Sequence, residues 1–246
     1  MQRIHKIRLD KLIAERNPML SRSKIQELII HGAVTVNGTV ITSSSYFTDI
    51  TALIELDVSL LRYVSRAGLK LDHALRLFKI SVANRVCLDA GLSTGGFTDC
   101  LLQHGARKVY GVDIGTAQVN QKIANDSRVI VLENTDIRSV LLHELMDIIT
   151  LDLSFISIIK VLEYVAKLLK PGGILITLIK PQFEVGFEAA RASAGVIKDE
   201  KLQKVAVAEV IKTISAAGLE YKNMAESPLL GGSGNKEFLA SFEKKL

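Results

Sequence analysis

The sequence contains no tryptophan, two cysteines and four prolines among 246 residues, and aromatic residues make up only 5%. Cys87 and Cys100 lack the spacing of a zinc or redox motif, so we expect no metal. Cys87 lies in an apolar segment, where a free cysteine usually serves as a small core residue. This cysteine usage is typical of a reducing environment and predicts a cytoplasmic protein.

Long apolar runs are also missing. No run approaches the roughly 20 residues that a membrane-spanning helix needs. The first eleven residues mix charged and apolar side chains, unlike the apolar core of a signal peptide. We therefore expect a soluble protein with no membrane partner and no export by that route. With 48% hydrophobic residues, the chain is long enough for one large domain and a smaller one.

Positive charge is modest overall but concentrated at one end. The net charge is +5, and residues 1–24 alone hold seven basic against two acidic side chains, an excess of five. A concentrated basic surface favours a phosphate backbone as partner. A solvated helix face that only maintains solubility explains the charge equally well.

Residues 1–59 read as a separate α+β unit. Apolar residues at helical spacing over 8–13 are followed by the breaker Asn17-Pro18, and Ser21 is a suitable N-cap for a second helix. Residues 33–36 and 39–41 flank Asn37-Gly38, a strong hairpin turn, and 53–56 form another short strand. Residues 60–64 then read as a linker.

The remaining residues, 65–246, alternate between strand and helix patterns, with strands near 85–89, 108–113, 128–132, 147–152 and 173–179, and helices over 156–169 and 199–217. We expect Lys170-Pro171-Gly172-Gly173 to stop the first of these helices, and two last strands over 219–226 and 237–243. Such alternation predicts an α/β fold with a doubly wound, mostly parallel, Rossmann-like sheet.

A glycine-rich turn follows the first of these strands. Asp89-x-Gly91-x-Ser93-x-Gly95-Gly96 places an acidic residue and several glycines between a strand and a helix. The second glycine of Gly-x-Gly-x-x-Gly is missing, which disfavours a dinucleotide pyrophosphate. The spacing suits S-adenosylmethionine, whose amino and carboxylate groups need an acid and free N–H groups. A tight turn without a ligand explains the pattern equally well.

Two further acids follow the next two strands. Asp113 can accept both ribose hydroxyls of a nucleotide cofactor. Asp136 can bind an adenine amino group between the apolar walls Ile114 and Ile137, although a helix N-cap accounts for Asp136 nearly as well. These positions predict a nucleotide site, and they do not separate a methyltransferase from a dehydrogenase.

Asp152 and Lys180 end the fourth and fifth strands. Because the carboxyl ends of adjacent parallel strands lie at one edge, we expect both side chains at the rim where ligands bind in open α/β sheets. Burying a carboxylate is costly unless it is paired. A structural ion pair that caps the sheet is the alternative.

The N-terminal unit resembles an S4 RNA-binding domain. The likeness rests on Arg8-Leu9-Asp10, Ser21-Arg22-Ser23 and Gly32-Ala33-Val34-Thr35-Val36-Asn37-Gly38. It implies that the basic residues of the helix pair contact RNA phosphates, which fixes position rather than base identity. The candidates are Arg8, Lys11, Arg22 and Lys24.

The whole chain resembles the TlyA family, whose members are known as hemolysin A and as 2'-O-ribose rRNA methyltransferases. The family motifs are Arg62-Tyr63-Val64, Ser65-Arg66-Ala67-Gly68-Leu69-Lys70-Leu71, Ser93-Thr94-Gly95-Gly96-Phe97-Thr98-Asp99, Asp152-Leu153-Ser154-Phe155-Ile156-Ser157, Lys180-Pro181-Gln182-Phe183-Glu184 and Gly234-Asn235-Lys236-Glu237-Phe238. The resemblance implies S-adenosylmethionine as cofactor, with Asp152 also beside it, and ribosomal RNA or a ribosomal subunit as partner. Arg62 and Arg66, in these motifs, are further RNA-binding candidates.

The catalytic domain of this family looks like the FtsJ (RrmJ) type, which uses a Lys-Asp-Lys-Glu tetrad. Matching the motifs places the tetrad on Lys70, Asp152, Lys180 and Glu237. A lysine can remove a hydroxyl proton only in its neutral form, which burial and a second lysine favour and nearby carboxylates oppose. We expect Lys180 to be the base, Lys70 to assist it, Asp152 to orient it, and Glu237 to position the lysines or the ribose.

Three other functions remain to be distinguished. An S4-tethered RNA-binding or ribosome-assembly factor would keep the sheet without using the tetrad. A membrane-lytic protein would need a long apolar span or an amphipathic membrane-seeking helix, and the sequence shows neither. A nicotinamide-dependent oxidoreductase would need the glycine pattern that is missing here.

Overall fold

The computed structural model describes residues 6–30, 32–186, 191, 193, 195–231 and 233–246. The chain divides between Arg62 and Tyr63 into two compact units. The division falls inside the predicted linker 60–64. Tyr63 is only 2% exposed in the core of the second unit, and Val64 packs against the same core, so both belong to that unit.

The first unit packs two helices on short strands. Helices α1 (Leu9–Arg16) and α2 (Arg22–Ile30) bury Leu9, Ile13, Ile25, Leu28 and Ile29 in a common core. A three-stranded sheet has the order β3-β2-β5, with β2 (Val34–Val36) paired to β3 (Thr39–Val40) and β5 (Ile54–Leu56). This confirms the predicted helices and hairpin, and a 3-10 helix over Val58–Leu61 follows.

Two strands of this unit were not predicted. β1 (Lys6–Arg8) pairs antiparallel with β4 (Phe47–Asp49), from Lys6↔Asp49 to Arg8↔Phe47. Each strand has three residues, too few to show an alternating pattern in the sequence. The predicted N-cap is present, since Ser21 Oγ accepts the Lys24 N–H at 3.4 Å.

The second unit contains a seven-stranded sheet with the order β11-β12-β10-β9-β6-β7-β8. Strands β10, β9, β6, β7 and β8 are parallel, whereas β12 is antiparallel to both β10 and β11. This confirms the mostly parallel α/β fold. The strand bounds are β6 (Val86–Ala90), β7 (Lys108–Val112), β8 (Val129–Leu132), β9 (Met146–Leu151), β10 (Leu169–Ile179), β11 (Leu219–Glu226) and β12 (Phe238–Lys244).

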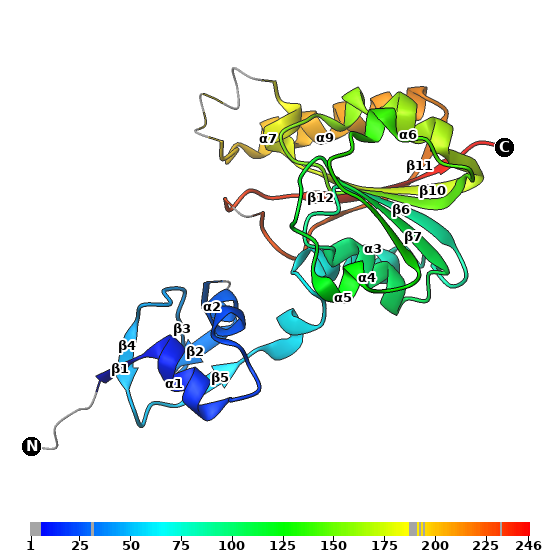
Figure 1. The fold of residues 1–246 in the computed structure, drawn as a ribbon. Helices are drawn as coiled ribbons and strands as arrows, with labels where there is room; N and C mark the ends of the chain where they lie inside the picture. Colours follow the sequence, from blue (N-terminus) through cyan, green and yellow to red (C-terminus); the bar gives the residue numbers. More distant parts are fainter. Residues whose placement is uncertain (1–5, 31, 187–190, 192, 194, 232) are drawn as a thin grey trace, which may run out of the picture. The chain divides into compact units, whose positions relative to one another are not determined.

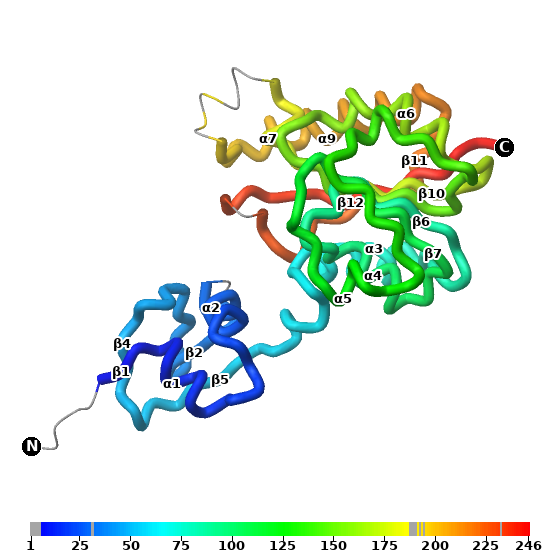
Figure 2. Tube along the Cα trace, viewed as in Figure 1, coloured from blue at the N-terminus to red at the C-terminus, as the bar shows by residue number. Residues whose placement is uncertain are grey.

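Helices cover both faces of this sheet. Figures 1 and 2 show α3 (Ala67–Leu77), α4 (Gly96–Gln103) and α5 (Gln121–Ala124) on one side, with α6 (Leu162–Leu168) and α9 (Glu200–Ala216) on the other. Strand side chains alternate between the two cores, and in β6 Leu88 faces one while Cys87 faces the other. Cys87 is therefore a buried core residue, as predicted.

The structure differs from the prediction before β10. The expected helix over 156–169 is divided into a 3-10 helix, η3 (Ile158–Lys160), and α6. The expected turn at 170–173 lies within β10, where the pairing with β9 jumps from Leu169↔Met146 to Ile174↔Ile148. Between these two paired positions β10 has three more residues than β9, and the strand accommodates them as an irregularity in the pairing. Gly172, with φ +71°, lies in this irregular segment.

Candidate active site

Two cavities lie at the edge of the sheet where β6, β7 and β9 end. The first has a volume of about 690 Å³ and receives five of the predicted cofactor residues. Clefts of several hundred cubic ångströms with a few converging polar groups are typical of small-molecule sites. The five residues are Gly91, Ser93, Asp113, Asp136 and Asp152.

Asp113 connects the glycine-rich turn to the loop after β7. Its Oδ2 accepts the Ser93 N–H and its Oδ1 accepts the Gly115 N–H, both at 2.7 Å. Each carboxylate oxygen retains a further lone pair, so hydroxyl groups can still bind there. Gly91 has φ +91°, and a Cβ on it would lie 2.4 Å from the Asp152 carbonyl oxygen. Only glycine allows this close approach.

Asp136 acts as a helix N-cap and also lines the first cavity, while its contact with an adenine stays a prediction. It caps the 3-10 helix η2 (Ile137–Ser139) by accepting the Arg138 N–H at 2.8 Å, and it pairs with the Arg138 guanidinium at 2.6 Å. These bonds hold the pKa of Asp136 below its usual range. The residue also lines the cavity, together with Ile114 and Ile137, the two predicted apolar walls.

Three predicted cofactor residues lie beside the cavity rather than in its lining. Asp89 is fully buried, and its carboxylate accepts the Thr98 hydroxyl at 2.7 Å and the Thr150 hydroxyl at 3.0 Å. Gly95 (φ +94°) precedes α4, and a Cβ on Gly96 would collide with Ser65 Oγ. All three support the glycine-rich turn in this structure, and their direct contact with a cofactor stays a prediction.

The buried Asp89 makes stability depend on pH. Burial is the largest effect on this carboxyl and raises its pKa to about 7. An unfolded chain has lost that proton by pH 5, whereas the folded chain keeps it until about pH 7. Folding is therefore penalised as pH rises through this window, by roughly 2 kcal/mol between pH 5 and 7.

We expect Asp89→Asn to remove this penalty. Urea unfolding at pH 5, 6, 7 and 8 measures the free energy of unfolding of both proteins. The value for the variant minus that for the wild type should increase as pH rises. The difference between the two proteins isolates Asp89 from the other titrating groups. A difference that stays constant with pH would show that Asp89 is ionised throughout.

The four tetrad residues are all in the second unit and form two ion pairs. Lys180 Nζ lies 2.7 Å from Asp152 Oδ1 and donates a hydrogen bond to Ser154 Oγ at 2.9 Å. Lys70 of α3 donates to Glu237 Oε2 at 2.5 Å. Lys70, Lys180 and Glu237 are each less than a tenth exposed, so these charges are shielded from bulk water.

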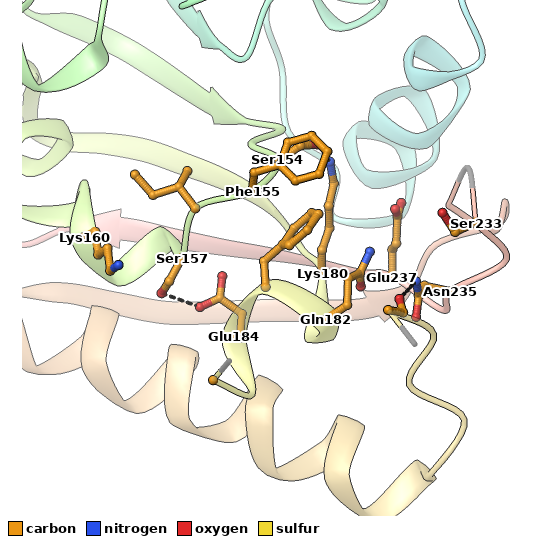
Figure 3. A pocket seen from close by; sticks show the side chains of 14 residues that line it. Ser154, Phe155, Ser157, Lys160, Lys180, Gln182, Glu184, Ser233, Asn235 and Glu237 are labelled. Carbon is orange, nitrogen blue, oxygen red and sulfur yellow. Dashed lines mark hydrogen bonds between the residues drawn. The ribbon is translucent and has the colours of Figure 1, made fainter. Parts of the chain in front are cut away.

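Strand register explains how the two pairs meet. In the antiparallel β10–β12 pair, Ile179 lies opposite Phe238. Lys180 directly follows Ile179 and Glu237 directly precedes Phe238, so both residues lie at the same end of this strand pair. Their side chains run next to each other into the second cavity (Figure 3), and both line it. Asp152 directly follows β9, which pairs with the other side of β10. The structure thus brings together residues that are 167 positions apart in the chain.

The second cavity, of about 790 Å³, shares a border with the first. Ser154, Phe155, Ile156 and Lys160 line both cavities. Phe155 is 91% exposed with φ +65°, and its ring centroid lies 5.3 Å from that of Phe183. The left-handed backbone at this non-glycine residue holds its ring in solvent at the border of the two cavities. No pattern in the sequence indicates this exposure.

Glu184 connects the loop that follows β9 to the short helix that follows β10. Its carboxylate accepts the Ser157 hydroxyl at 2.6 Å (Figure 3). It also accepts the Ile158 N–H at 3.0 Å. Glu184 ends the short helix α7 (Pro181–Glu184), which begins directly after Lys180, and Ser157 belongs to the loop that follows Asp152. Burial raises the pKa of Glu184. The motif Lys180–Glu184 therefore positions the Asp152 loop as well as the lysine.

One further cluster has ligand chemistry. The ligand atoms of Asp72, Cys100 and His104 lie within 4.8 Å of one another, between α3 and α4 and outside the lining of either cavity. Asp72 Oδ1 is already 2.8 Å from His104 Nε2 and accepts the Arg76 Nε–H at 3.1 Å. The adjacent guanidinium makes the position unfavourable for a cation, so we read the cluster as an interhelical contact.

Two of the proposed RNA-binding arginines share one buried acid. Arg8 and Arg22 both pair with Asp10 Oδ2, at 2.9 and 2.8 Å, and Gln26 donates to the same oxygen. These bonds lower the pKa of Asp10 despite the opposing effect of burial. The motif Arg-Leu-Asp thus fixes both arginines through one carboxylate. Their half-exposed guanidinium groups retain a net positive charge.

The other basic candidates have different surroundings. Lys11 is exposed on α1, and Lys24 pairs with Glu27 at 3.0 Å. Arg62 is exposed at the end of the first unit, and Arg66 is partly buried at the start of α3. Their contact with RNA stays a prediction.

Comparison with known proteins agrees with this geometry. Residues 63–244 match the FtsJ-like methyltransferase family, and residues 7–49 match the S4 domain. Hemolysin A of Brachyspira hyodysenteriae is 42% identical over 96% of this chain and 99% of its own. The 16S/23S rRNA (cytidine-2'-O)-methyltransferase TlyA of Mycobacterium tuberculosis is 37% identical over 94% and 87%. The 23S rRNA (cytidine-2'-O)-methyltransferase TlyA of Campylobacter jejuni is 35% identical over 97% and 100%.

A solved structure is similar along the whole chain. A provisionally named hemolysin of Streptococcus thermophilus has a TM-score of 0.76 and 35% identity, covering 99% of this chain and 90% of its own. Within the described residues, no helix has the length and apolarity to cross a bilayer.

Proposed function

This chain belongs to the FtsJ-like methyltransferase family, and from that premise we propose that it methylates a ribose 2'-hydroxyl of ribosomal RNA with S-adenosylmethionine. The observation that carries this proposal is the shared border of two cavities. Nucleotide-type carboxylates line one cavity, and Lys180 and Glu237, paired with Asp152 and Lys70, line the other. We place the reaction in the cytoplasm, where ribosomal RNA is found.

The residues of the first cavity fit S-adenosylmethionine. Asp113 offers acceptors for ribose hydroxyls, and Asp136 with Ile114 and Ile137 offers an acceptor and apolar walls for an adenine. Asp152, at the border with the second cavity, would lie near the sulfonium. When bound, this cofactor supplies a methyl group already activated by its positive sulfur.

The chain's own residues then have to align the hydroxyl and remove its proton. We assign proton removal to Lys180 Nζ, which opens into the second cavity. Asp152 and Ser154 fix the direction of this amine, and the Lys70–Glu237 pair holds the ribose from the other side. Lys180 takes up the hydroxyl proton and becomes charged and paired with Asp152, and later loss of this proton to solvent restores the neutral amine for the next turnover.

The nucleotide and the RNA are inferred from the relatives. Two of them are named for cytidine 2'-O-methylation, one in 23S rRNA and one in both 16S and 23S rRNA. We therefore propose a cytidine of 23S rRNA as the substrate, with 16S rRNA as a second one. The exposed ring of Phe155 at the border supports a nucleoside substrate, because aromatic side chains stack unpaired bases.

Transfer of a tritiated methyl group from S-adenosylmethionine to purified 23S rRNA, 16S rRNA and ribosomal subunits tests this proposal. We expect incorporation that survives alkaline hydrolysis as a dinucleotide, because a 2'-O-methyl group blocks cleavage. RNA binding without incorporation would instead indicate an assembly factor. Dye release from liposomes would indicate a lytic protein, and calorimetric binding of a nicotinamide cofactor an oxidoreductase.

A further inference from the structure

Lys160 stands at one end of the second cavity without a role in the tetrad. It ends η3 and is one of four residues that line both cavities. Figure 3 shows it well separated from Lys180 and Glu237, with the loop that carries Ser154 and Phe155 between them. A substrate whose reacting hydroxyl lies at Lys180 would therefore extend towards Lys160.

No acidic side chain of the described residues pairs with Lys160. Of the cations that line the two cavities, Lys180 pairs with Asp152 and Arg138 pairs with Asp136. Lys160 is exposed, and no carboxylate within the described part of the chain lies within 4.0 Å of its ammonium. Its side chain is thus available to a ligand.

Two carboxylates in this cavity oppose the entry of RNA. Glu184 and Glu237 both line it, and a phosphodiester backbone that enters would be repelled by carboxylates. Glu237 is paired with Lys70, whereas the donors to Glu184 among the described residues, from Ser157 and Ile158, are uncharged. Lys160 is on the same short helix as Ile158 and offsets this negative charge.

We infer that Lys160 binds an RNA phosphate adjacent to the methylated ribose. This inference rests on the proposed function. It gives the RNA two points of contact with the protein, one at the reacting oxygen and one at a backbone phosphate. A lysine suits this task because its ammonium is a compact point charge on a flexible stem. Each such contact releases condensed counterions, so the affinity it provides depends on salt.

The test compares Lys160→Met with Lys160→Arg and Lys212→Met. Lys212 is 79% exposed on α9 and lines neither cavity, so its variant removes the same charge elsewhere. For Lys160→Met we expect the KM for the RNA that the wild type methylates to rise about 10-fold, with kcat within about two-fold. The slope of log(kcat/KM) against log salt should fall by about 0.7 to 0.9.

The two other variants separate charge from structure. Lys160→Arg should recover the KM to within about three-fold, and Lys212→Met should match the wild type in both KM and salt slope. The Kd for S-adenosylmethionine, measured by calorimetry, should not change in Lys160→Met. A raised cofactor Kd with unchanged RNA KM would assign Lys160 to the cofactor and overturn the inference.

Failure of the inference differs from failure of the proposed function. Wild-type methylation with an unchanged KM and salt slope in Lys160→Met rejects the phosphate contact alone. An equal effect of Lys212→Met shows that only the overall charge matters, which also rejects it. If the wild type transfers no methyl group to any ribosomal RNA or subunit, the proposed function fails and the inference falls with it.

Discussion

Lys180→Ala should lower methyl transfer by about 10³-fold or more while the Kd for S-adenosylmethionine stays within about three-fold of the wild type. The variant loses the group to which we assign proton removal, and the ribose hydroxyl is a weak nucleophile without it. Asp113 and Asp136, the carboxylates that we propose for the cofactor, are not changed. Single-turnover methylation and calorimetric titration measure the two quantities on the same preparations.

Two variants distinguish loss of the base from loss of an ion pair. Lys180→Arg keeps a positive charge beside Asp152, but its guanidinium cannot lose a proton in a protein. We expect it to be as inactive as Lys180→Ala. Lys170→Ala breaks another ion pair between β10 and its neighbour, Lys170–Asp147, at the same 2.7 Å. Because this pair lies at the opposite end of the strands, we expect full activity.

Two results would contradict the assignment of Lys180. Activity of Lys180→Arg above about a tenth of the wild type would show that only the charge is needed, for orientation or for the cofactor. An activity loss in Lys170→Ala comparable to that of Lys180→Ala would show that any break in the β10 pairing disables the enzyme. Either result would leave the proton acceptor to be sought elsewhere.

The positions of the parallel strands, and of Asp152 and Lys180 after two of them, could be predicted because they depend on regular spacing. Parallel strands end at one edge of a sheet, so Asp152 and Lys180, each directly after an apolar run, had to lie near each other. The placement of Lys70 and Glu237 came from family resemblance alone. Nothing local in the sequence relates a helix residue to one that is 167 positions away.

The sequence could not predict which of two similar side chains is buried and which lines a cavity. Asp89 and Asp113 both end strands and look equivalent in the sequence, yet Asp89 is buried against two threonines and Asp113 lines the cavity. The side-chain direction within each turn decides this difference. Exposed residues such as Phe155 and Lys160 carry no periodic pattern, so only the structure shows that they border both cavities.

Gly91→Ala should have the second-largest effect, on the cofactor rather than on the base. An alanine Cβ would lie 2.4 Å from the Asp152 carbonyl oxygen and 2.9 Å from its carbonyl carbon, which are backbone atoms without freedom to rotate away. The strand end would have to move, and with it Asp152 and the cavity floor. We expect the affinity for S-adenosylmethionine to fall at least about 30-fold and the free energy of unfolding to fall by about 2 to 4 kcal/mol.

Gly105→Ala is the matched control for this variant. Gly105 has φ +87°, close to the +91° of Gly91, but the nearest atom to its Cβ would be Ala83 Cα at 3.6 Å, an ordinary contact. This variant carries the cost of the left-handed backbone, about 1 to 2 kcal/mol, without the collision. Urea unfolding and calorimetric titration should therefore show a modest loss of stability and an unchanged cofactor Kd. If Gly91→Ala loses no more cofactor affinity than Gly105→Ala, the close approach of Gly91 to Asp152 is not what shapes the cofactor cavity.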